Sequence, residues 1–368
     1  MANLELLRCL AMMMVVVLHF LGKGNLLGDV AAGQMDGVGI FSWVLESFCI
    51  VAVNVYMLIS GYFLSTSSFK LSRLIRLWLQ VWFYSVGVGL LAVVCGMIPM
   101  SEVGTNYFIQ LLFPISMGHY WFLTAYVFLY ILLPLLTMAV KNMTKQQMQV
   151  TVILLLLTFS IIKSVVPVRL DMDGKGYDCL WYVCVFLVAA YLRRFGFPFL
   201  EKKGRGLCLY VIGCIAIFAE LWCLHLVYVQ TGSLGYILTV SMEYNHVLPL
   251  LASVGLFAAF LRVNISGKLA DVVRRIAPYT LGVYLLHENV GVRTVWQNWF
   301  GADGVSSVGE LILRTLAAVA VVFVVGILVD FLRSLLMGVA HKGLLHWSFY
   351  EKVVNRVQRV DSYFSEKE

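Results

Sequence analysis

The stretch LLRCLAMMMVVVLHFL, residues 6–21, decides the class of fold to which this chain belongs. It is an almost unbroken apolar run, and a helix rising about 1.5 Å per residue would carry it across most of the ~30 Å hydrocarbon core of a bilayer. Similar runs continue along the chain, so 61% of the residues are hydrophobic and 13% are charged. An ordinary soluble domain has about a quarter charged residues. The sequence therefore predicts an all-α, polytopic membrane helical bundle and excludes a disordered chain or a soluble domain with one anchor.

Ten apolar runs predict about ten transmembrane helices. The runs are 6–21, 40–64, 77–98, 120–140, 148–168, 177–192, 206–229, 234–261, 278–300 and 311–339. The first run could instead be a cleaved signal peptide. Glu5 beside Arg8, and the lack of a nearby small-residue cleavage site, favour a retained span. The apolar segment 105–114 is too short to cross and is expected to be re-entrant or interfacial.

The basic residues set the expected orientation of the bundle. If the N-terminus lies inside, the inner loops hold most lysines and arginines, and the outer loops hold little beyond Lys23, Arg169 and Lys175. The net charge of +7 then reflects topology rather than nucleic-acid binding. We expect both termini on the cytoplasmic side of a bacterial inner (cytoplasmic) membrane. Residues 1–340 would form the membrane domain, and 341–368 an amphipathic cytoplasmic tail.

The cysteines and the absence of certain motifs reduce the range of possible functions. The eight cysteines lie mostly inside apolar runs, and Cys179 and Cys184 do not have the spacing of metal ligands. We interpret the cysteines as small buried apolar residues and expect no metal. The sequence has no Walker A motif, which argues against an ATP-driven pump formed by this chain alone.

Ionisable side chains inside the runs are the strongest functional signal in this sequence. Arg8 and His19 are separated by close to three helical turns, so both should lie on one face of the first helix, about 16 Å apart. Taken alone, Arg8 could be a snorkelling arginine that sets topology, and His19 could be a satisfied core histidine. Their common face favours a functional site.

A second group of candidate site residues lies at the end of the second apolar run and just after it. Asn54, Ser60 and Tyr62 lie at the end of the run. Arg73 and Arg76 come next and are neighbours on a helical surface. Two guanidinium groups at the mouth of a membrane cavity suit a polyphosphate ligand. The alternative is an ordinary positive-inside loop.

The later runs add further polar candidates. His119 and Trp121 open the fourth run, where an aromatic cluster is typical of an interfacial belt. Tyr284, His287 and Glu288 lie in the ninth run and indicate a polar interior, although adjacent residues do not face one another on a helix. Weaker candidates at membrane depth are Glu220, His225, Glu243 and His246, for which core or loop roles are the simpler interpretation.

Five stretches of this chain, taken in their order along the sequence, resemble the acyltransferase family 3 integral-membrane acyltransferases. The resemblance covers nearly the whole chain. Arg8, ten intervening residues and His19 match one family pattern, and VNVYMLISGYFL (53–64) matches the end of its second span. Arg73-Leu-Ile-Arg76, HYWFL (119–123) and YLLH (284–287) match three more. Asn54 is a departure, because many members have Asp there. Many relatives also carry an extracytoplasmic hydrolase-like domain, which this chain lacks, so we expect it to complete transfer itself or with a separate partner.

The resemblance implies transfer of an acyl group, often acetyl, from cytoplasmic acyl-CoA to a hydroxyl of a cell-envelope glycan or lipid-linked sugar. By the same resemblance His19 is the catalytic histidine, acting as a general base or as an acyl carrier, and Arg8, Arg73 and Arg76 serve the acyl-CoA donor. The remaining candidates are expected along the substrate cavity: Asn54, Ser60, Tyr62, His119, Trp121, Tyr284, His287 and Glu288. The expected partners are membrane lipid, acetyl-CoA or another acyl-CoA, and the sugar acceptor, with no nucleic acid.

A secondary transporter on the same membrane fold, for example for amino-acid uptake, is the alternative function. Buried Arg and His pairs also mark transport paths. Transport by rocking repeats predicts internal symmetry, and the sequence shows none. A purely structural membrane protein would leave Arg8 and His19 unexplained.

Overall fold

The computed structural model describes residues 1–166 and 173–365. The regular elements in these residues are all helices, of the α, 3-10 and π types, and none is a strand. Arg169, which the sequence places in an outer loop, lies outside the described residues. The α-helices are α1 (Ala2–Lys23), α2 (Gly37–Cys49), α3 (Ala52–Leu64), α4 (Leu71–Val94), α5 (Thr105–Leu112), α6 (Trp121–Ile131), α7 (Leu133–Asn142), α8 (Lys145–Leu156), α9 (Ile162–Val165), α10 (Cys179–Phe195), α11 (Pro198–Glu201), α12 (Arg205–Thr231), α13 (Val247–Leu261), α14 (Gly267–Ile276), α15 (Thr280–His287), α16 (Val308–Leu344) and α17 (Ser348–Ser365).

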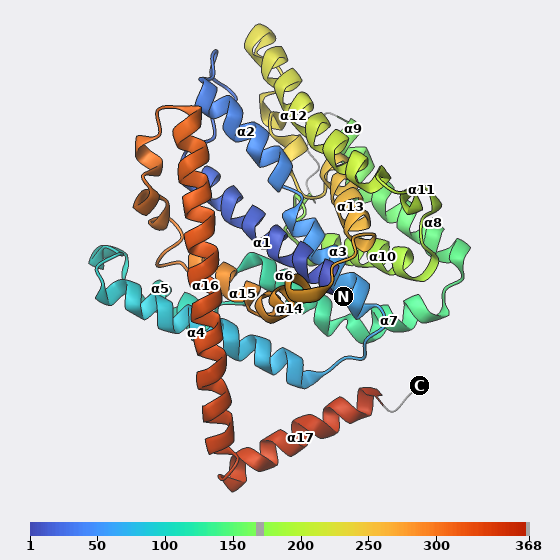
Figure 1. Cartoon of the computed structure of the whole chain (residues 1–368), viewed down its shortest axis with the longest axis vertical. Coiled ribbons are helices and arrows are strands. Elements are labelled where there is room, and N and C mark those ends of the chain that lie inside the picture. Colours follow the sequence, from blue (N-terminus) through green and yellow to red (C-terminus); the bar gives the residue numbers. More distant parts are fainter. Residues whose placement is uncertain (167–172, 366–368) are drawn as a thin grey trace.

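The first apolar run forms α1, which lies in the middle of the bundle (Figure 1). It contacts α2, α3, α13, α14, α15 and α16. Most of its side chains are therefore buried against protein, and Leu4, Leu7 and Leu21 are completely so. A helix surrounded in this way can carry polar side chains into the interior, because its neighbours rather than lipid are there to meet them.

Seven helices in the described part of the chain are long and apolar enough to cross a membrane. They are Ala2–Lys23, Gly37–Leu64, Leu71–Val94, Lys145–Val165, Arg205–Thr231, Gly235–Leu261 and Val308–Leu344. The pair α6 and α7 is bent by 57° and would make an eighth span. The expected count of about ten is not confirmed, and the expected orientation of the termini stays a prediction. The run 177–192 forms α10, whose 17 residues are shorter than a full span.

The expectation of one continuous span over 278–300 is wrong. The helix α15 has eight residues and ends at His287, and a series of turns leads to a 3-10 helix over Trp296–Phe300. The backbone that leaves the helix finds partners inside the bundle: the Val290 N–H donates to His119 Nε2 at 2.8 Å. The side chain of Asn289 donates to the Tyr84 carbonyl at 3.0 Å. Irregular backbone at membrane depth requires such buried partners.

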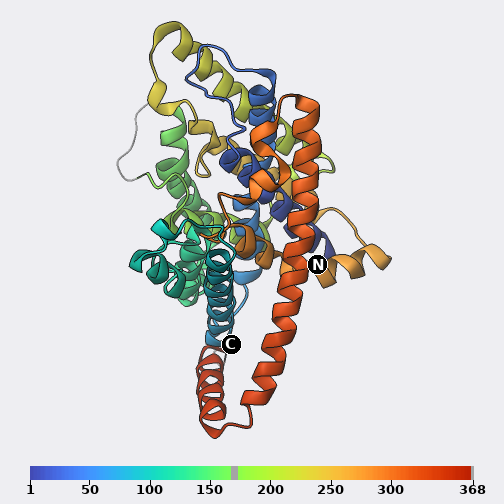
Figure 2. The same cartoon turned by 90° about the vertical axis from the view of Figure 1, so that its left-hand side faces the viewer.

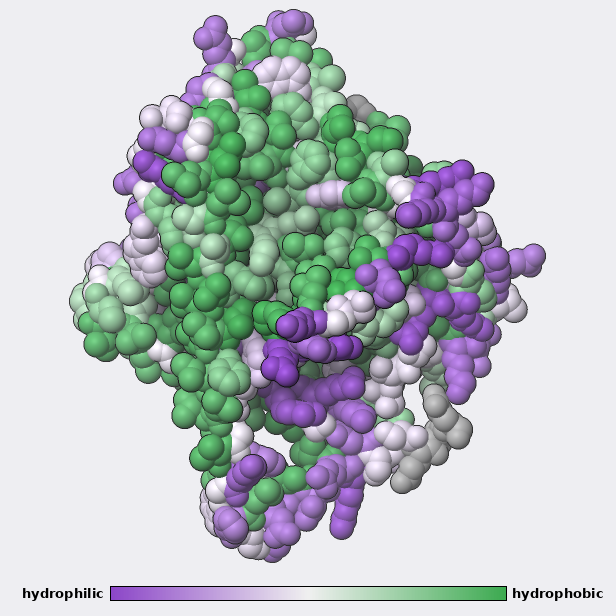
Figure 3. Space-filling model, viewed as in Figure 1, coloured by the Kyte–Doolittle hydropathy of each residue, from purple (hydrophilic) through white to green (hydrophobic). Residues whose placement is uncertain are grey.

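Much of the outer surface of the bundle is apolar. The helix α16 has 37 residues and runs along one side of the molecule, beyond the other helices and toward α17 (Figures 1 and 2). Hydrophobic residues cover much of the face shown in Figure 3, and hydrophilic residues gather at its right and lower parts. Exposed apolar side chains of α16 include Leu313, Leu316, Leu328, Leu332, Leu336 and Val339. This surface fits contact with lipid, because water would leave it poorly solvated.

Glycines allow the close packing of α12 against α13. A Cβ atom on Gly255 would lie 2.7 Å from the Tyr210 nitrogen and 2.8 Å from the Gly206 carbonyl oxygen. A Cβ on Gly206 would lie 2.7 Å from the Ala259 nitrogen. These are backbone atoms, so neither helix can yield without moving as a whole. Small residues at helix contacts are the usual means by which membrane helices approach closely.

We predict that Gly255→Ala destabilises the protein by about 1–3 kcal/mol, because the added methyl group forces α12 and α13 apart. The matched control is Gly87→Ala in α4, where a Cβ would meet nothing within 4 Å. That variant should keep or slightly raise stability, since Ala favours a helix over Gly. Thermal unfolding in detergent measures both, and equal midpoints for the two variants would contradict the packing argument.

Candidate functional site

Two adjoining cavities lie beside α1. The larger has a volume of about 300 Å³ and is lined by Arg8, Tyr56, Ser60, Arg73, Tyr126 and Tyr130 among others. The smaller has a volume of about 40 Å³ and contains His19 in its wall. Tyr56, Phe122 and Leu281 line both cavities. Arg8 and His19 therefore line neighbouring cavities that share part of their walls, a region on the same side of α1, as their spacing predicts.

Two histidines from distant parts of the chain meet at the His19 end of this region. His19 Nδ1 lies 2.9 Å from His287 Nε2. His287 Nδ1 lies 2.6 Å from the Val283 carbonyl, one turn earlier in α15. A carbonyl oxygen can only accept, so His287 carries its proton on Nδ1 and offers the lone pair of Nε2. His19 must then donate from Nδ1, and its own Nε2 holds the lone pair.

Glu288 completes the group. Its Oε1 atom lies 3.3 Å from His19 Nδ1. The same carboxylate forms an ion pair with Lys23, at the end of α1. His287 and Glu288 would not both reach one partner from a continuous helix. They do so here because α15 ends at His287, so that the chain turns at Glu288.

One candidate ligand atom from each of His19, His287 and Glu288 lies within 4.8 Å of the other two, which is a spacing that suits a metal ion. The ammonium group of Lys23 already occupies Glu288. A cation placed in this group would be repelled by Lys23 and would compete with it for the carboxylate. The residues therefore fit a hydrogen-bonded histidine pair better than a metal centre.

Arg73 and Arg76 do not occupy equivalent places. Both side chains are exposed on the first turns of α4, but only Arg73 lines the larger cavity. The Arg76 Nε–H donates to the Ser72 carbonyl at 3.2 Å. Arg8 is ion-paired with Glu5. The structure thus brings Arg8 and Arg73 to one cavity and leaves Arg76 outside its lining.

Three of the other predicted residues line the cavities. Ser60 belongs to the larger cavity, and Trp121 and Tyr284 belong to the smaller one. The Trp121 ring stacks on Tyr244 with centroids 5.6 Å apart, so it forms a wall of the cavity rather than an interfacial belt alone.

Asn54 supports that wall instead of lining the cavity. It is fully buried, and its amide donates to the Tyr244 carbonyl at 2.7 Å. Its Oδ1 accepts from the Trp181 indole at 2.9 Å. An amide can donate and accept at once, which an ionised Asp cannot. The neutral side chain at this position therefore matches its two partners.

His119 also holds backbone in place. His119 Nδ1 lies 3.2 Å from the Ser85 hydroxyl, and Nε2 accepts from Val290 as described above. This links α4 to the turn after Glu288. Tyr62 lies outside both cavity linings, where the Arg193 guanidinium sits 4.7 Å from its ring centre. Among the weaker candidates, His225 Nδ1 lies 2.9 Å from the Val30 carbonyl, and His246 lies 3.4 Å from Glu220.

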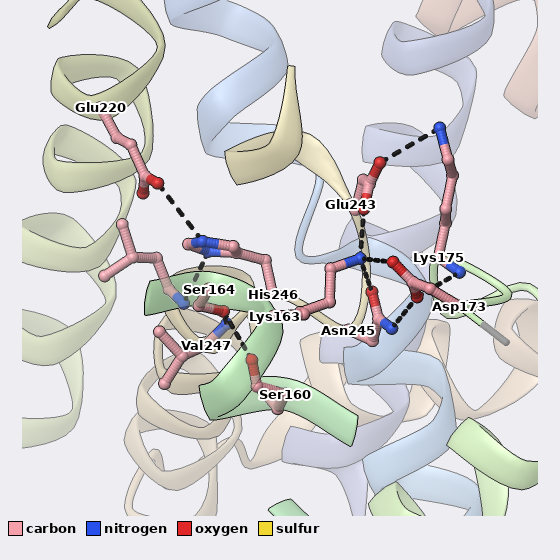
Figure 4. Close-up of polar contacts among 11 residues, drawn as sticks. Ser160, Lys163, Ser164, Asp173, Lys175, Glu220, Glu243, Asn245, His246 and Val247 are labelled. Carbon is pink, nitrogen blue, oxygen red and sulfur yellow. Dashed lines mark hydrogen bonds and ion pairs between the residues drawn. The ribbon is translucent and has the colours of Figure 1, made fainter. Parts of the chain in front are cut away.

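A buried lysine forms the centre of a second polar group, shown in Figure 4. Lys163 has a side chain that is only 4% exposed, and it forms ion pairs with Asp173 and Glu243. Its third donor reaches Asn245 Oδ1 at 2.9 Å. Lys175 contacts the other oxygen of Glu243 at 3.1 Å. Two cations thus balance two carboxylates, and all three ammonium protons of Lys163 have acceptors.

This group fixes the wall of the smaller cavity. Tyr244 stands between two of its members, Glu243 and Asn245, and its ring lines the cavity. Burial alone raises the pKa of Asp173. Hydrogen bonds from Lys163 and Asn245 more than offset this effect, so the pKa of that carboxyl lies below its usual value. The carboxylate is therefore held in its charged form, as the ion pair requires.

Several residues of the site were missed by the sequence reasoning. Lys163 is the only charged residue of the apolar run 148–168, and Asp330 is the only acidic residue of the run 311–339. Such charges inside apolar runs mark membrane residues with a buried partner. Asp330 accepts from Gln80 at 2.9 Å and from the Tyr84 hydroxyl at 3.1 Å, which joins α16 to α4. The roles of Lys23 and Tyr244 had no such signal, because Lys23 follows the first run and Tyr244 is an uncharged aromatic residue inside the run 234–261.

Comparison with known proteins gives one family. A family model described as an acyltransferase domain matches residues 1–330. No curated protein and no solved structure matches the chain. The matched region contains α1, both histidines and the start of α4, and it ends inside α16.

We predict that Lys163→Met lowers the free energy of unfolding by about 3–5 kcal/mol, because it leaves buried carboxylates without their cation. Lys175→Met is the matched control. Its side chain is 47% exposed, and loss of its ion pair with Glu243 should cost about 0–1 kcal/mol. Unfolding in detergent, followed by temperature or denaturant, separates the two. A similar loss for both variants would show that Lys163 is not the centre of this group.

Proposed function

The chain belongs to the acyltransferase domain family, and on that premise we propose that it is an integral-membrane, acyl-CoA-dependent O-acyltransferase. It moves an acetyl or other short acyl group from cytoplasmic acyl-CoA to a hydroxyl of a cell-envelope glycan or lipid-linked sugar. One observation carries the proposal: the cavity with Arg8 and Arg73 in its lining adjoins the cavity of His19.

The donor occupies the larger cavity. Coenzyme A carries several phosphate charges, and planar guanidinium groups bind phosphate with two parallel hydrogen bonds. Arg8 and Arg73 supply these groups from two different helices. Arg76, three positions further along α4, acts outside the cavity as a weaker electrostatic contact. In this proposal the mouth of the larger cavity lies on the cytoplasmic side, together with both termini.

The acyl group reaches the smaller cavity. Its volume of about 40 Å³ is close to the room of about three water molecules. Apolar and aromatic residues form most of its wall, among them Val15, Leu18, Phe122 and Tyr284. Such a space suits an acetyl group better than a long acyl chain, and this supports acetyl-CoA as the donor.

His19 acts as the general base. The hydrogen bond to His287 places a lone pair on His19 Nε2, so this nitrogen can take the proton from the acceptor hydroxyl. The hydroxyl oxygen then attacks the thioester carbonyl, the carbon–sulfur bond breaks, and the coenzyme A thiolate receives the proton. The products are an O-acyl ester and free coenzyme A, so protons and charge balance without a further reactant.

His287 and Glu288 hold His19 for this step. His287 fixes the tautomer by accepting from Nδ1. When His19 is protonated on Nε2, the Glu288 carboxylate at 3.3 Å from Nδ1 stabilises the imidazolium. The ion pair with Lys23 holds the Glu288 carboxylate in place. The acceptor approaches from the extracytoplasmic side, past the wall of Trp121 and Tyr244, in a bacterial inner membrane. Nothing in the described residues favours the secondary transporter.

We predict that purified protein in detergent binds acetyl-CoA saturably and that Arg73→Ala raises the Kd about tenfold or more, because one charge-assisted phosphate contact is lost. Arg76→Ala is the matched control on the same helix and should raise it less. Isothermal titration calorimetry measures both. Absence of binding by folded wild-type protein would contradict the proposed donor. Equal effects of the two substitutions would contradict the distinct place of Arg73.

We predict that His19→Ala lowers acyl transfer by about 10²–10⁴-fold, the usual contribution of a general base, and leaves acetyl-CoA binding and the melting temperature near wild-type values. The assay follows labelled acetyl from acetyl-CoA into the lipid and glycan fractions of membranes that contain the protein. Transfer at the wild-type rate by the variant would remove His19 from the mechanism.

A further inference from the structure

The last helix of the chain, α17, lies beyond the matched family region and packs against α4. It follows α16 through a short turn and lies below α4 in both views of the bundle (Figures 1 and 2). Its half-buried positions include Val354, Val357 and Asp361, spaced by three and four residues. One face of α17 is therefore turned toward protein.

Asp361 supplies a cap that the start of α4 lacks. The residue before α4 is Lys70, whose side chain makes no capping hydrogen bond. The first N–H groups of a helix have no partner within the helix and need an acceptor from elsewhere. Asp361 Oδ1 accepts from the Ser72 N–H at 3.1 Å. A carboxylate is also favoured here by the positive end of the helix dipole.

Aromatic packing adds a second connection at the same place. Phe364 lies against Phe69, with ring centroids 5.0 Å apart and the planes at 65°. Phe69 also meets Tyr130, with centroids 5.3 Å apart. Edge-to-face ring pairs at such distances contribute beyond their buried area. The segment just before α4 is thus held between α17 and α6.

These contacts lead directly to the larger cavity. Arg73 follows Ser72 in the first turn of α4 and lines the cavity. Tyr130 lines it as well. The Tyr130 hydroxyl accepts from the Lys70 N–H at 3.1 Å and lies 3.2 Å from the Lys70 carbonyl, to which it donates. Any shift in the segment over 69–72 would move both cavity residues.

We propose that α17 completes the donor site, with Asp361 and Phe364 as positioning residues that hold the start of α4 and so place Arg73 and Tyr130 for acyl-CoA. The inference rests on the proposed function, because it takes coenzyme A phosphates as the ligand of Arg73. It goes beyond that function by assigning a binding role to a helix outside the matched family region.

The hydrogen bond and the charge of Asp361 lead to opposite predictions for the affinity of the donor. As a cap, Asp361 favours donor binding, and an Asn in its place keeps the acceptor oxygen. As a negative charge beside Arg73, it would oppose phosphate binding, and its removal in any form would tighten the complex. Comparing Asp361→Ala with Asp361→Asn therefore separates the two effects.

The experiment titrates acetyl-CoA into full-length protein in detergent and records the melting temperature of each variant. We expect Asp361→Ala to raise the Kd about three- to tenfold, from the usual effect of losing a helix cap, while Asp361→Asn stays within about twofold of wild type. Glu351→Ala is the matched control, since Glu351 is an exposed acidic residue near the other end of α17. It should leave the Kd unchanged.

Phe364→Ala is the second variant, and it tests the same connection without changing charge. It should raise the Kd in the same direction as Asp361→Ala, and Phe364→Leu should restore part of the affinity. The inference is overturned if Asp361→Ala and Phe364→Ala bind as wild type does while folded. It is also overturned if Asp361→Asn binds as weakly as Asp361→Ala, or if both Asp361 variants bind more tightly. Wild-type protein that is folded but does not bind acetyl-CoA would instead contradict the proposed function and remove the basis of this inference.

Discussion

The structure depends on one constraint: a polar group at membrane depth needs a partner inside the protein, because lipid offers none. The clearest case is the end of α15 at His287. The backbone and side chains that leave the helix there are met by His119, by the Tyr84 carbonyl and by the Tyr120 hydroxyl. Those same bonds hold the turn that brings Glu288 to His19.

The constraint also explains why the polar residues fall into a few closed groups. The His19 group has one carboxylate and one lysine, and the Lys163 group pairs two lysines with two carboxylates. A buried ion pair contributes little net stability, but removing one member leaves an uncompensated charge. Such groups therefore act mainly by holding neighbouring residues in position. The one at Lys163 fixes Tyr244, and the one at His19 fixes the tautomer of the histidine.

Long-range connections are concentrated around α4. Asp330 of α16 bonds its middle through Gln80 and Tyr84, His119 bonds it through Ser85, and Asp361 of α17 caps its first turn. The helix that carries Arg73 is thus held at several levels by segments that follow much later in the chain. Placement of a cavity arginine to a fraction of an ångström requires this kind of support, because an isolated arginine side chain has many conformers.

The sequence by itself determined the membrane bundle, the first helix with Arg8 and His19 on one face, and the stretches that resemble the family. Each of these follows from local properties, namely run length, helical period and residue order. Only the tertiary structure decided that His287 and Glu288 both meet His19, that Arg73 and not Arg76 lines the cavity, and that Asp361 caps α4. These contacts join residues far apart in the chain, and one of them exists because a helix stops where an apolar run continues. A periodic pattern contains no information on where a neighbouring element supplies a partner, so such contacts come only from the folded chain.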